Sequence, residues 1–343
     1  MKLSPPTSTT RIAKWDNAKA FLIILVVFGH GIGKYNSLGG YMHEVEIFLY
    51  SFHMPLFMFL AGLFSKNYIK AKPFRYNRIG GFILLHFFIK FTVWITEVLC
   101  GQNKKLLLFE ENGTAWYIFV LAIIMLITRL VHECEPWKVL ITGVIASLCV
   151  GFSNEVGNFL MLSRIVVFFP IFYLGFMLDR NKLLKFLNHP AVKIASVVVL
   201  IVFIFGIFRY IDKVYYFRRV LTGNHPYKNF RSFYNFGPAL RLAGYLMNLI
   251  VGGAVLSLIP SRRIPLFTMC GTRSLQIYAL HRQILFVIQY SEYGVALREI
   301  NPNLIILIFF GIAIAISLVL SLKPFEYIMK PFAGEWFKKK SNA

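Results

Sequence analysis

Long apolar runs separated by basic residues constrain this chain more than any other feature of its sequence. Such runs begin near residues 17, 43, 79, 114, 138, 162, 191, 237, 274 and 304, and each approaches the ~20 residues that an α-helix needs to cross a bilayer. Only 15% of the 343 residues are charged, whereas about 25% is usual for a soluble domain. The sequence therefore predicts an all-α, polytopic integral membrane protein with about ten transmembrane helices in a single bundle.

The distribution of Lys and Arg between these runs indicates an orientation. With a cytoplasmic N-terminus, roughly twice as many basic residues fall on the inner side as on the outer side, which is the bias seen in membrane proteins. We therefore expect both termini in the cytoplasm and the protein in the cell membrane. The first apolar run lacks a cleavage site after it, so we expect it to remain as a signal anchor. The predicted divisions are a cytoplasmic tail (1–16), a transmembrane domain (17–322) and a basic cytoplasmic tail (323–343).

The formal net charge of +22 does not indicate a nucleic-acid partner. A nucleic-acid-binding protein gathers its basic residues on one solvated face, whereas here they lie between hydrophobic runs. Four cysteines without CxxC spacing, and histidines without acidic residues at ligand spacing, predict neither a metal site nor an essential disulfide.

One external segment is unusually basic and aromatic. Between the seventh and eighth runs, six basic residues alternate with Tyr and Phe: Arg209, Lys213, Arg218, Arg219, Lys228 and Arg231. Aromatic faces stack on sugar rings and basic groups pair with carboxylates, so this loop suits a sugar chain, including an acidic one. An interfacial helix resting on lipid headgroups is an equally good interpretation.

Ionisable residues inside the apolar runs are candidates for a functional site. A basic group at mid-membrane costs about 2.5–3.5 kcal/mol, so it usually faces a polar cavity. His30 lies well inside the first run, and Lys19 precedes it by 11 residues, which places both on one helix face about 16 Å apart. Lys19 and Arg241 could instead extend to a membrane interface.

Two further apolar runs contain polar residues that could line the same polar cavity. In the second run, Pro55 follows His53 by two residues and frees backbone groups near it. Ser274, Tyr278 and His281 are spaced by four and three residues, so they share one face of a helix.

Arg75 and Arg78 precede the third run on the predicted inner side. On a helix they would share a face, and guanidinium groups bind phosphate oxygens through two parallel hydrogen bonds. This favours a ligand that carries phosphate, although arginine pairs in inner loops are also common determinants of topology.

Taken in order, these segments resemble the membrane acyltransferase-3 family, in the branch related to fucose 4-O-acetylases. The segments that carry the resemblance are Arg11 to Lys19 continuing to His30, Phe52 to Gly62, Arg75 with Arg78, Trp116-Tyr117, Arg164 to Gly175, and Ser274 to His281. Ala61 departs from the Ser-Gly ending that is more common at the second segment.

The resemblance implies an enzyme that transfers an acyl group, usually acetyl, from cytoplasmic acyl-CoA to a hydroxyl of a carbohydrate. It places the family's histidine at His30 and its arginine pair at Arg75 and Arg78. Acetyl-CoA would be a co-substrate, and no cofactor would be bound permanently. The acceptor would be a cell-surface polysaccharide or its lipid-linked precursor. No segment resembles the extracytoplasmic hydrolase-like domain of some members, so the acyl group either reaches the acceptor directly or passes to a separate partner protein.

The expected chemistry needs a base and preorganised donors. A sugar hydroxyl is a weak nucleophile at neutral pH, and a neutral imidazole can remove its proton or carry the acyl group. We expect the catalytic residues to be His30, Lys19, His281 and Tyr278, with acyl-CoA bound by Arg75 and Arg78 and the substrate contacted by His53, Arg164 and Ser274. The alternative function is a transporter or flippase for a lipid-linked sugar or oligosaccharide, which would use the same polar groups without chemistry.

Overall fold

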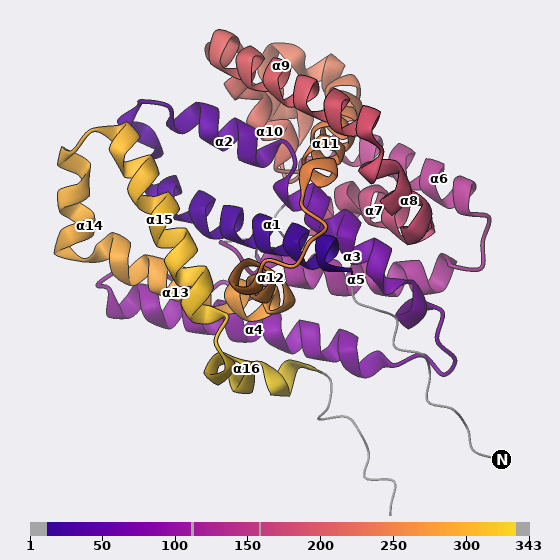
Figure 1. Ribbon diagram of the computed structural model, residues 1–343, viewed down its shortest axis with the longest axis horizontal. Helices are drawn as coiled ribbons and strands as arrows, with labels where there is room; N and C mark the ends of the chain where they lie inside the picture. Colours follow the sequence, from indigo (N-terminus) through magenta and orange to yellow (C-terminus); the bar gives the residue numbers. More distant parts are fainter. Residues whose placement is uncertain (1–11, 111–112, 158, 334–343) are drawn as a thin grey trace, which may run out of the picture.

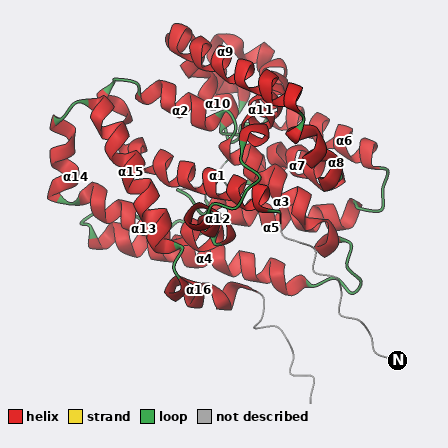
Figure 2. Cartoon of the chain, viewed as in Figure 1, coloured by secondary structure: helices red, strands yellow, loops and turns green. Residues whose placement is uncertain are grey.

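The computed structural model describes residues 12–110, 113–157 and 159–333, and all of its regular structure is helical (Figures 1 and 2). The α-helices are α1 (Ala13–Ile32), α2 (Met42–Tyr50), α3 (His53–Ile69), α4 (Tyr76–Leu99), α5 (Trp116–Val131), α6 (Pro136–Val150), α7 (Leu162–Met177), α8 (Arg180–Asn188), α9 (Pro190–Val214), α10 (Arg218–Leu221), α11 (Gly237–Leu258), α12 (Pro265–Thr272), α13 (Ser274–Tyr290), α14 (Glu292–Ala296), α15 (Pro302–Leu320) and α16 (Lys323–Met329). Short 3-10 helices are η1 (Gly33–Leu38), η2 (Tyr215–Phe217), η3 (Tyr227–Phe236), η4 (Leu297–Glu299) and η5 (Lys330–Ala333). Within the described residues the single β-bridge joins Glu110 to Phe159. The all-α prediction is confirmed.

Six helical segments in the described part of the chain are long and apolar enough to span a bilayer: Ala13–Leu38, Met42–Ile69, Tyr76–Leu99, Pro190–Leu221, Ser232–Leu258 and Pro302–Leu320. A seventh span results if α7 and α8, which are bent by 91° at a short break, are taken together. The helices α5 and α6 are apolar but shorter. The chain is thus a multi-pass membrane protein, whereas the number ten and the cytoplasmic position of both termini stay predictions.

The predicted tails are described only in part. Residues 1–11, including Arg11 of the opening motif, and residues 334–343 lie outside the described residues. The helix α1 begins at Ala13, within the predicted N-terminal tail, and α16 lies in the predicted C-terminal tail.

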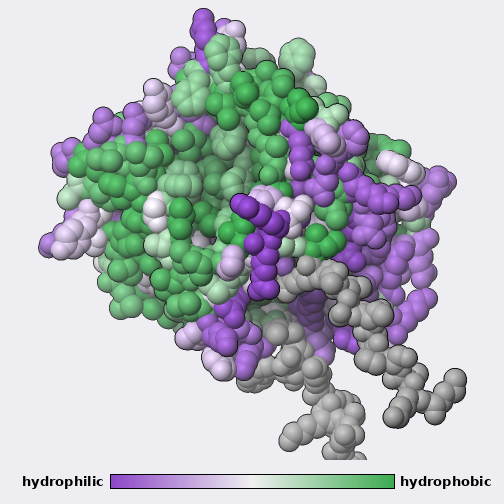
Figure 3. All heavy atoms as spheres, in the orientation of Figure 1, coloured by the Kyte–Doolittle hydropathy of each residue, from purple (hydrophilic) through white to green (hydrophobic). Residues whose placement is uncertain are grey.

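The outer surface of the bundle is apolar where lipid would contact it. Figure 3 shows hydrophobic side chains gathered over α9 and α15. On α9, Ile201 and Phe205 expose 62% and 69% of their surface. A soluble monomer rarely exposes a contiguous apolar face of this kind, so this surface supports a position in the bilayer.

The helix α1 lies at the centre of the bundle, against α3, α12, α13 and α15. Its first turns are fixed by hydrogen bonds to the end of α11. The Lys14 ammonium is fully buried and donates to the carbonyls of Ser257 (2.9 Å) and Ile259 (2.7 Å), while the Asn17 amide donates to those of Pro260 and Arg262. Because the last carbonyls of a helix lack partners within it, these side chains satisfy groups that would otherwise be buried and unpaired.

Two glycines allow α3 and α7 to approach each other at backbone distance. A Cβ atom at Gly62 would lie 1.9 Å from the carbonyl oxygen of Phe172, and one at Gly175 would lie 2.1 Å from that of Phe59. Small residues permit such close helix contacts in membranes. The glycines that end two of the sequence motifs therefore serve this crossing.

Several basic residues in the apolar runs bind backbone carbonyls. Lys90 donates to Leu107 (2.6 Å) and Glu110, and Arg241 donates to Ser147 (2.6 Å) and His225. These hydrogen bonds offset the cost of burying the charge. At Arg241 the side chain therefore neither extends to an interface nor needs a ligand.

The basic and aromatic segment expected as a loop is largely helical. The helix α9 continues to Val214, and η2, α10 and η3 occupy most of the remainder. Arg218 binds the carboxylate of Glu46 on α2 at 2.9 Å, so this segment packs on the bundle. Burial, together with the charges of nearby arginines, lowers the pKa of His225 in the same segment.

Candidate active site

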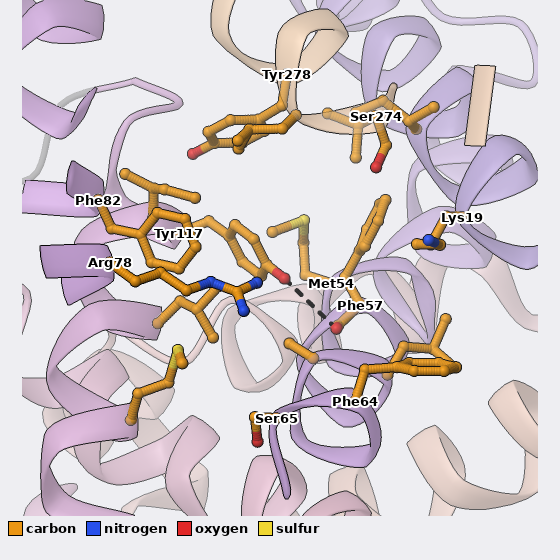
Figure 4. A pocket seen from close by; sticks show the side chains of 18 of the residues that line it. Lys19, Met54, Phe57, Phe64, Ser65, Arg78, Phe82, Tyr117, Ser274 and Tyr278 are labelled. Atoms are coloured by element: carbon orange, nitrogen blue, oxygen red, sulfur yellow. Dashed lines mark hydrogen bonds between the residues drawn. The ribbon is translucent and has the colours of Figure 1, made fainter. Parts of the chain in front are cut away.

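One cavity of the bundle has a volume of about 560 Å³ and is named here the Lys19 cavity (Figure 4). It is lined by Lys19, Ile23 and Val26 of α1, by Met54, Phe57, Leu60, Ala61, Phe64 and Ser65 of α3, by Arg78 and Phe82 of α4, by Tyr117, Ile118, Leu121 and Met125 of α5, by Ser274, Leu275 and Tyr278 of α13, and by Phe332. The walls are mainly apolar, with a few polar groups that converge from different helices. This composition is typical of a small-molecule site.

Four predicted site residues meet at this cavity. Figure 4 shows Lys19 and Arg78 on opposite sides, with Ser274 and Tyr278 along one edge. The Lys19 ammonium pairs with the carboxylate of Asp16 at 2.7 Å, and its side chain is 29% exposed. Residues separated by up to 259 positions in the sequence thus share one cavity.

The structure separates the two arginines of the predicted phosphate site. Arg78 lies in the first turn of α4, and its guanidinium lies 5.1 Å from the Tyr68 ring centroid and 5.5 Å from that of Phe82. Arg75 precedes the helix, is exposed, and accepts a hydrogen bond from the Tyr68 hydroxyl through its carbonyl. Only Arg78 lines the Lys19 cavity.

A second cavity, of about 330 Å³, is named here the His30 cavity. Its lining is His30 with Gly29, Ile32, Gly33, Lys34, Asn36, Glu46, Leu49, Tyr50, Glu97, Lys104, Arg282, Phe286, Gln289 and Tyr290. These residues come from η1, from α2, from Lys104 and from the C-terminal parts of α1, α4 and α13, whereas the Lys19 cavity uses residues nearer the N-terminal ends of α1, α4 and α13. The two cavities therefore lie at opposite ends of the bundle.

His30 and His281 form a close pair. Their ring centroids lie 5.5 Å apart, with the planes at 33°. His281 is fully buried, and its Nδ1 lies 3.0 Å from the Ile277 carbonyl and 2.8 Å from that of Tyr278. A carbonyl can only accept, so Nδ1 carries the hydrogen and Nε2 keeps its lone pair. Nε2 has no hydrogen-bond partner among the described residues.

A series of rings connects the two cavities. Tyr117 and Tyr278 have centroids 5.6 Å apart, and Tyr278 lies 6.2 Å from His281, which in turn faces His30. Tyr117 and Tyr278 line the Lys19 cavity and His30 lines the other. The histidine pair therefore occupies the region between the cavities.

A family model described as an acyltransferase domain matches residues 12–322, which include every helix from α1 to α15. The chain belongs to the acyltransferase-3 family. Its fold and family therefore identify a membrane acyltransferase. Neither the curated proteins nor the solved structures include a match to this chain.

The Tyr278 hydroxyl is engaged in a hydrogen bond in this structure, and its predicted catalytic role stays a prediction. Its hydroxyl donates to the carbonyl of Thr114, so that hydrogen is already used and is not free for an oxyanion. The Tyr117 hydroxyl likewise donates to the Phe57 carbonyl at 3.4 Å (Figure 4). Both tyrosines join α13, α5 and α3 around the cavity.

His53 and Arg164 line neither of the two cavities. The His53 Nδ1 lies against the carbonyl of Leu49, and its ring contacts that of Tyr50 edge-on at 5.5 Å. The Arg164 guanidinium lies 4.0 Å from the centroid of a Trp116 ring. The predicted substrate contacts of these two residues stay predictions, and in this structure both support neighbouring side chains.

Arg282 is a site residue that the sequence interpretation did not assign. It follows His281 directly, lines the His30 cavity, and donates to the carbonyl of His30 at 3.1 Å. Gln289 donates to the same carbonyl at 2.9 Å. The sequence did contain a signal for Arg282, because it is a basic residue inside an apolar run.

Among the described residues, no group of three or more His, Cys, Asp or Glu could hold a metal ion.

Proposed function

We propose that this acyltransferase moves an acyl group, most simply acetyl, from cytoplasmic acyl-CoA to a hydroxyl of a cell-surface polysaccharide or of its lipid-linked precursor. The main observation in support is the pair of His30 and His281 between two cavities at opposite ends of the bundle. The cell membrane as location, cytoplasmic termini, and the fucose 4-O-acetylase-like branch belong to the same proposal.

The Lys19 cavity suits the acyl-CoA donor. Its apolar walls match the uncharged arm and acyl group of the thioester, and Arg78 supplies a guanidinium for phosphate oxygens. Lys19 lies on the opposite wall, where its ammonium is paired with the carboxylate of Asp16. Arg75 lies on the same side of the bundle, three residues before Arg78, where it would act on phosphate groups outside the cavity.

His30 is the proposed base. The acceptor hydroxyl forms a bond to the acyl carbon as its proton moves to the imidazole, the C–S bond breaks, and the proton then passes to the leaving thiolate. The unpaired Nε2 of His281 lies beside the His30 ring and would accept its N–H, leaving the other His30 nitrogen free for the hydroxyl.

A covalent route uses the same residues. The acyl group would first form a bond to a His30 nitrogen as the C–S bond breaks and the thiolate leaves. The acceptor hydroxyl would then attack the acyl carbon, the C–N bond would break, and the hydroxyl proton would pass to the released imidazole. In either route the tetrahedral oxyanion requires preorganised positive charge or donors. Arg282, which donates to the His30 carbonyl, is a charged group beside the proposed base, whereas Lys19 lies about 16 Å away along α1. The final acceptor would be the glycan itself or a separate acyl-accepting protein.

Acyl transfer can be tested with the purified protein in nanodiscs. With radiolabelled acetyl-CoA and membrane glycan extracts, we expect release of CoA and label in a glycan. His30→Ala should lower the rate by about 10²–10⁴-fold, whereas His189→Ala, at an exposed histidine between α8 and α9, should retain it. An unchanged rate in His30→Ala would remove His30 from the mechanism. A flippase would consume no acyl-CoA, so binding of glycan without CoA release would overturn the proposed function.

A further inference from the structure

The His30 cavity is strongly charged, in contrast to the largely apolar Lys19 cavity. Three basic side chains line it, namely Lys34, Lys104 and Arg282, together with the two carboxylates of Glu46 and Glu97. If these basic and acidic side chains paired only with one another, the cavity would offer a ligand no unpaired charge. The partners of each group therefore decide what the cavity can bind.

Both carboxylates already have partners. Glu46 accepts from Arg218 at 2.9 Å and from the Tyr215 hydroxyl at 2.8 Å. Glu97 pairs with the ammonium of Lys104 at 3.1 Å. These contacts neutralise the acidic side of the cavity.

Lys34 and Arg282 pair with neutral groups. The Lys34 ammonium donates to the Gln289 carbonyl at 3.0 Å and lies 3.1 Å from the centroid of the Tyr290 ring. The Arg282 guanidinium donates to the His30 carbonyl and lies 4.1 Å from the Phe286 ring centroid. Over the part of the chain that the structure describes, neither has a carboxylate within 4.0 Å, and the Nε of Arg282 has no hydrogen-bond partner. The carboxylate of Glu97 acts on Arg282 only from longer range.

We infer that the His30 cavity receives an acceptor sugar that carries a carboxylate, which Arg282 and Lys34 bind while the hydroxyl to be acylated lies beside His30. This inference rests on the proposed function and names its acceptor class. Hydrogen bonds from a cation to a carboxylate are stronger than those to neutral groups. Because Arg282 is hydrogen-bonded to the backbone of His30, it would hold the acidic group at a fixed distance from the base. A neutral sugar would leave both cations without an anion, which selects against it.

The binding test needs no acyl-CoA. The purified protein in nanodiscs is titrated with a glucuronate-containing oligosaccharide and with the same oligosaccharide after reduction of its carboxyl groups. We expect the acidic form to bind at least about tenfold more tightly at low salt, with a smaller difference at high salt. Arg282→Gln and Lys34→Gln should each remove most of this preference. Lys138→Gln, at a lysine of α6 that is 78% exposed, is the matched control and should keep it.

Several outcomes would overturn the inference. Equal binding of the two oligosaccharides, absence of binding by both, or a preference that survives in both Arg282→Gln and Lys34→Gln would each do so. A third titration uses glucose 1-phosphate, and tighter binding of that probe would assign the cations to a phosphate group instead. Transfer of acetyl to a neutral glycan without acidic preference would refute this inference and leave the proposed function intact. Acidic preference without CoA release would refute the proposed function and the role of the bound sugar as acceptor, while the carboxylate-binding site itself would stand.

Discussion

The His30 and His281 rings lie 5.5 Å apart, one on α1 and one on α13, and the carbonyls of Ile277 and Tyr278 hold the hydrogen of His281 on its Nδ1. If His281 orients His30, His281→Ala should lower kcat by roughly 10-fold to 10³-fold while the KM for acyl-CoA stays within a factor of two. Steady-state CoA release measures both constants. A rise in KM with an unchanged kcat would instead place His281 in donor binding.

The separation of Arg75 from Arg78 gives a second prediction. Arg78→Gln should raise the KM for acyl-CoA about 10- to 100-fold, because it removes charged hydrogen bonds worth roughly 1.5–3 kcal/mol inside a cavity. Arg75→Gln should raise it less than about threefold, because Arg75 does not line the cavity and solvent screens its charge. Equal effects of the two substitutions would contradict the distinction that the structure makes.

The crossing of α3 and α7 predicts a large effect of a single methyl group. Gly62→Ala and Gly175→Ala each place Cβ within about 2 Å of a backbone oxygen, so the helices must separate, at a cost of about 1–3 kcal/mol or more. Thermal unfolding in detergent should show a lower Tm for both. Gly253→Ala is the control, because nothing lies within 4 Å of that position, and its Tm should be unchanged or higher.

The buried ammonium of Lys14 predicts a loss of stability without a direct loss of chemistry. Lys14→Met leaves the carbonyls of Ser257 and Ile259 without their donor, which costs about 1–3 kcal/mol for each group. The Tm should fall, and the activity of the protein that remains folded should be retained. Lys185→Met, at an exposed position of α8, should leave the Tm unchanged. A normal Tm for Lys14→Met would show that other groups satisfy these carbonyls.

The sequence by itself determined the apolar character of the chain, its all-helical fold and its family. These properties depend on local composition and on the order of short motifs, which is why the amino-acid sequence alone indicates Lys19, His30, Arg78, Ser274 and His281 as candidates. The helical spacing of Ser274, Tyr278 and His281 also placed them correctly on one helix, α13.

Only the tertiary structure decided what each polar side chain contacts. Lys19 and His30 share α1, yet they line different cavities, because the helices that complete each cavity contact α1 at different depths. Arg241 binds carbonyls of α6 and of the segment before η3, and Arg282 holds the His30 carbonyl from 252 residues away. Spacing along one helix predicts a shared face, but the partner on that face comes from distant parts of the chain and follows from packing alone.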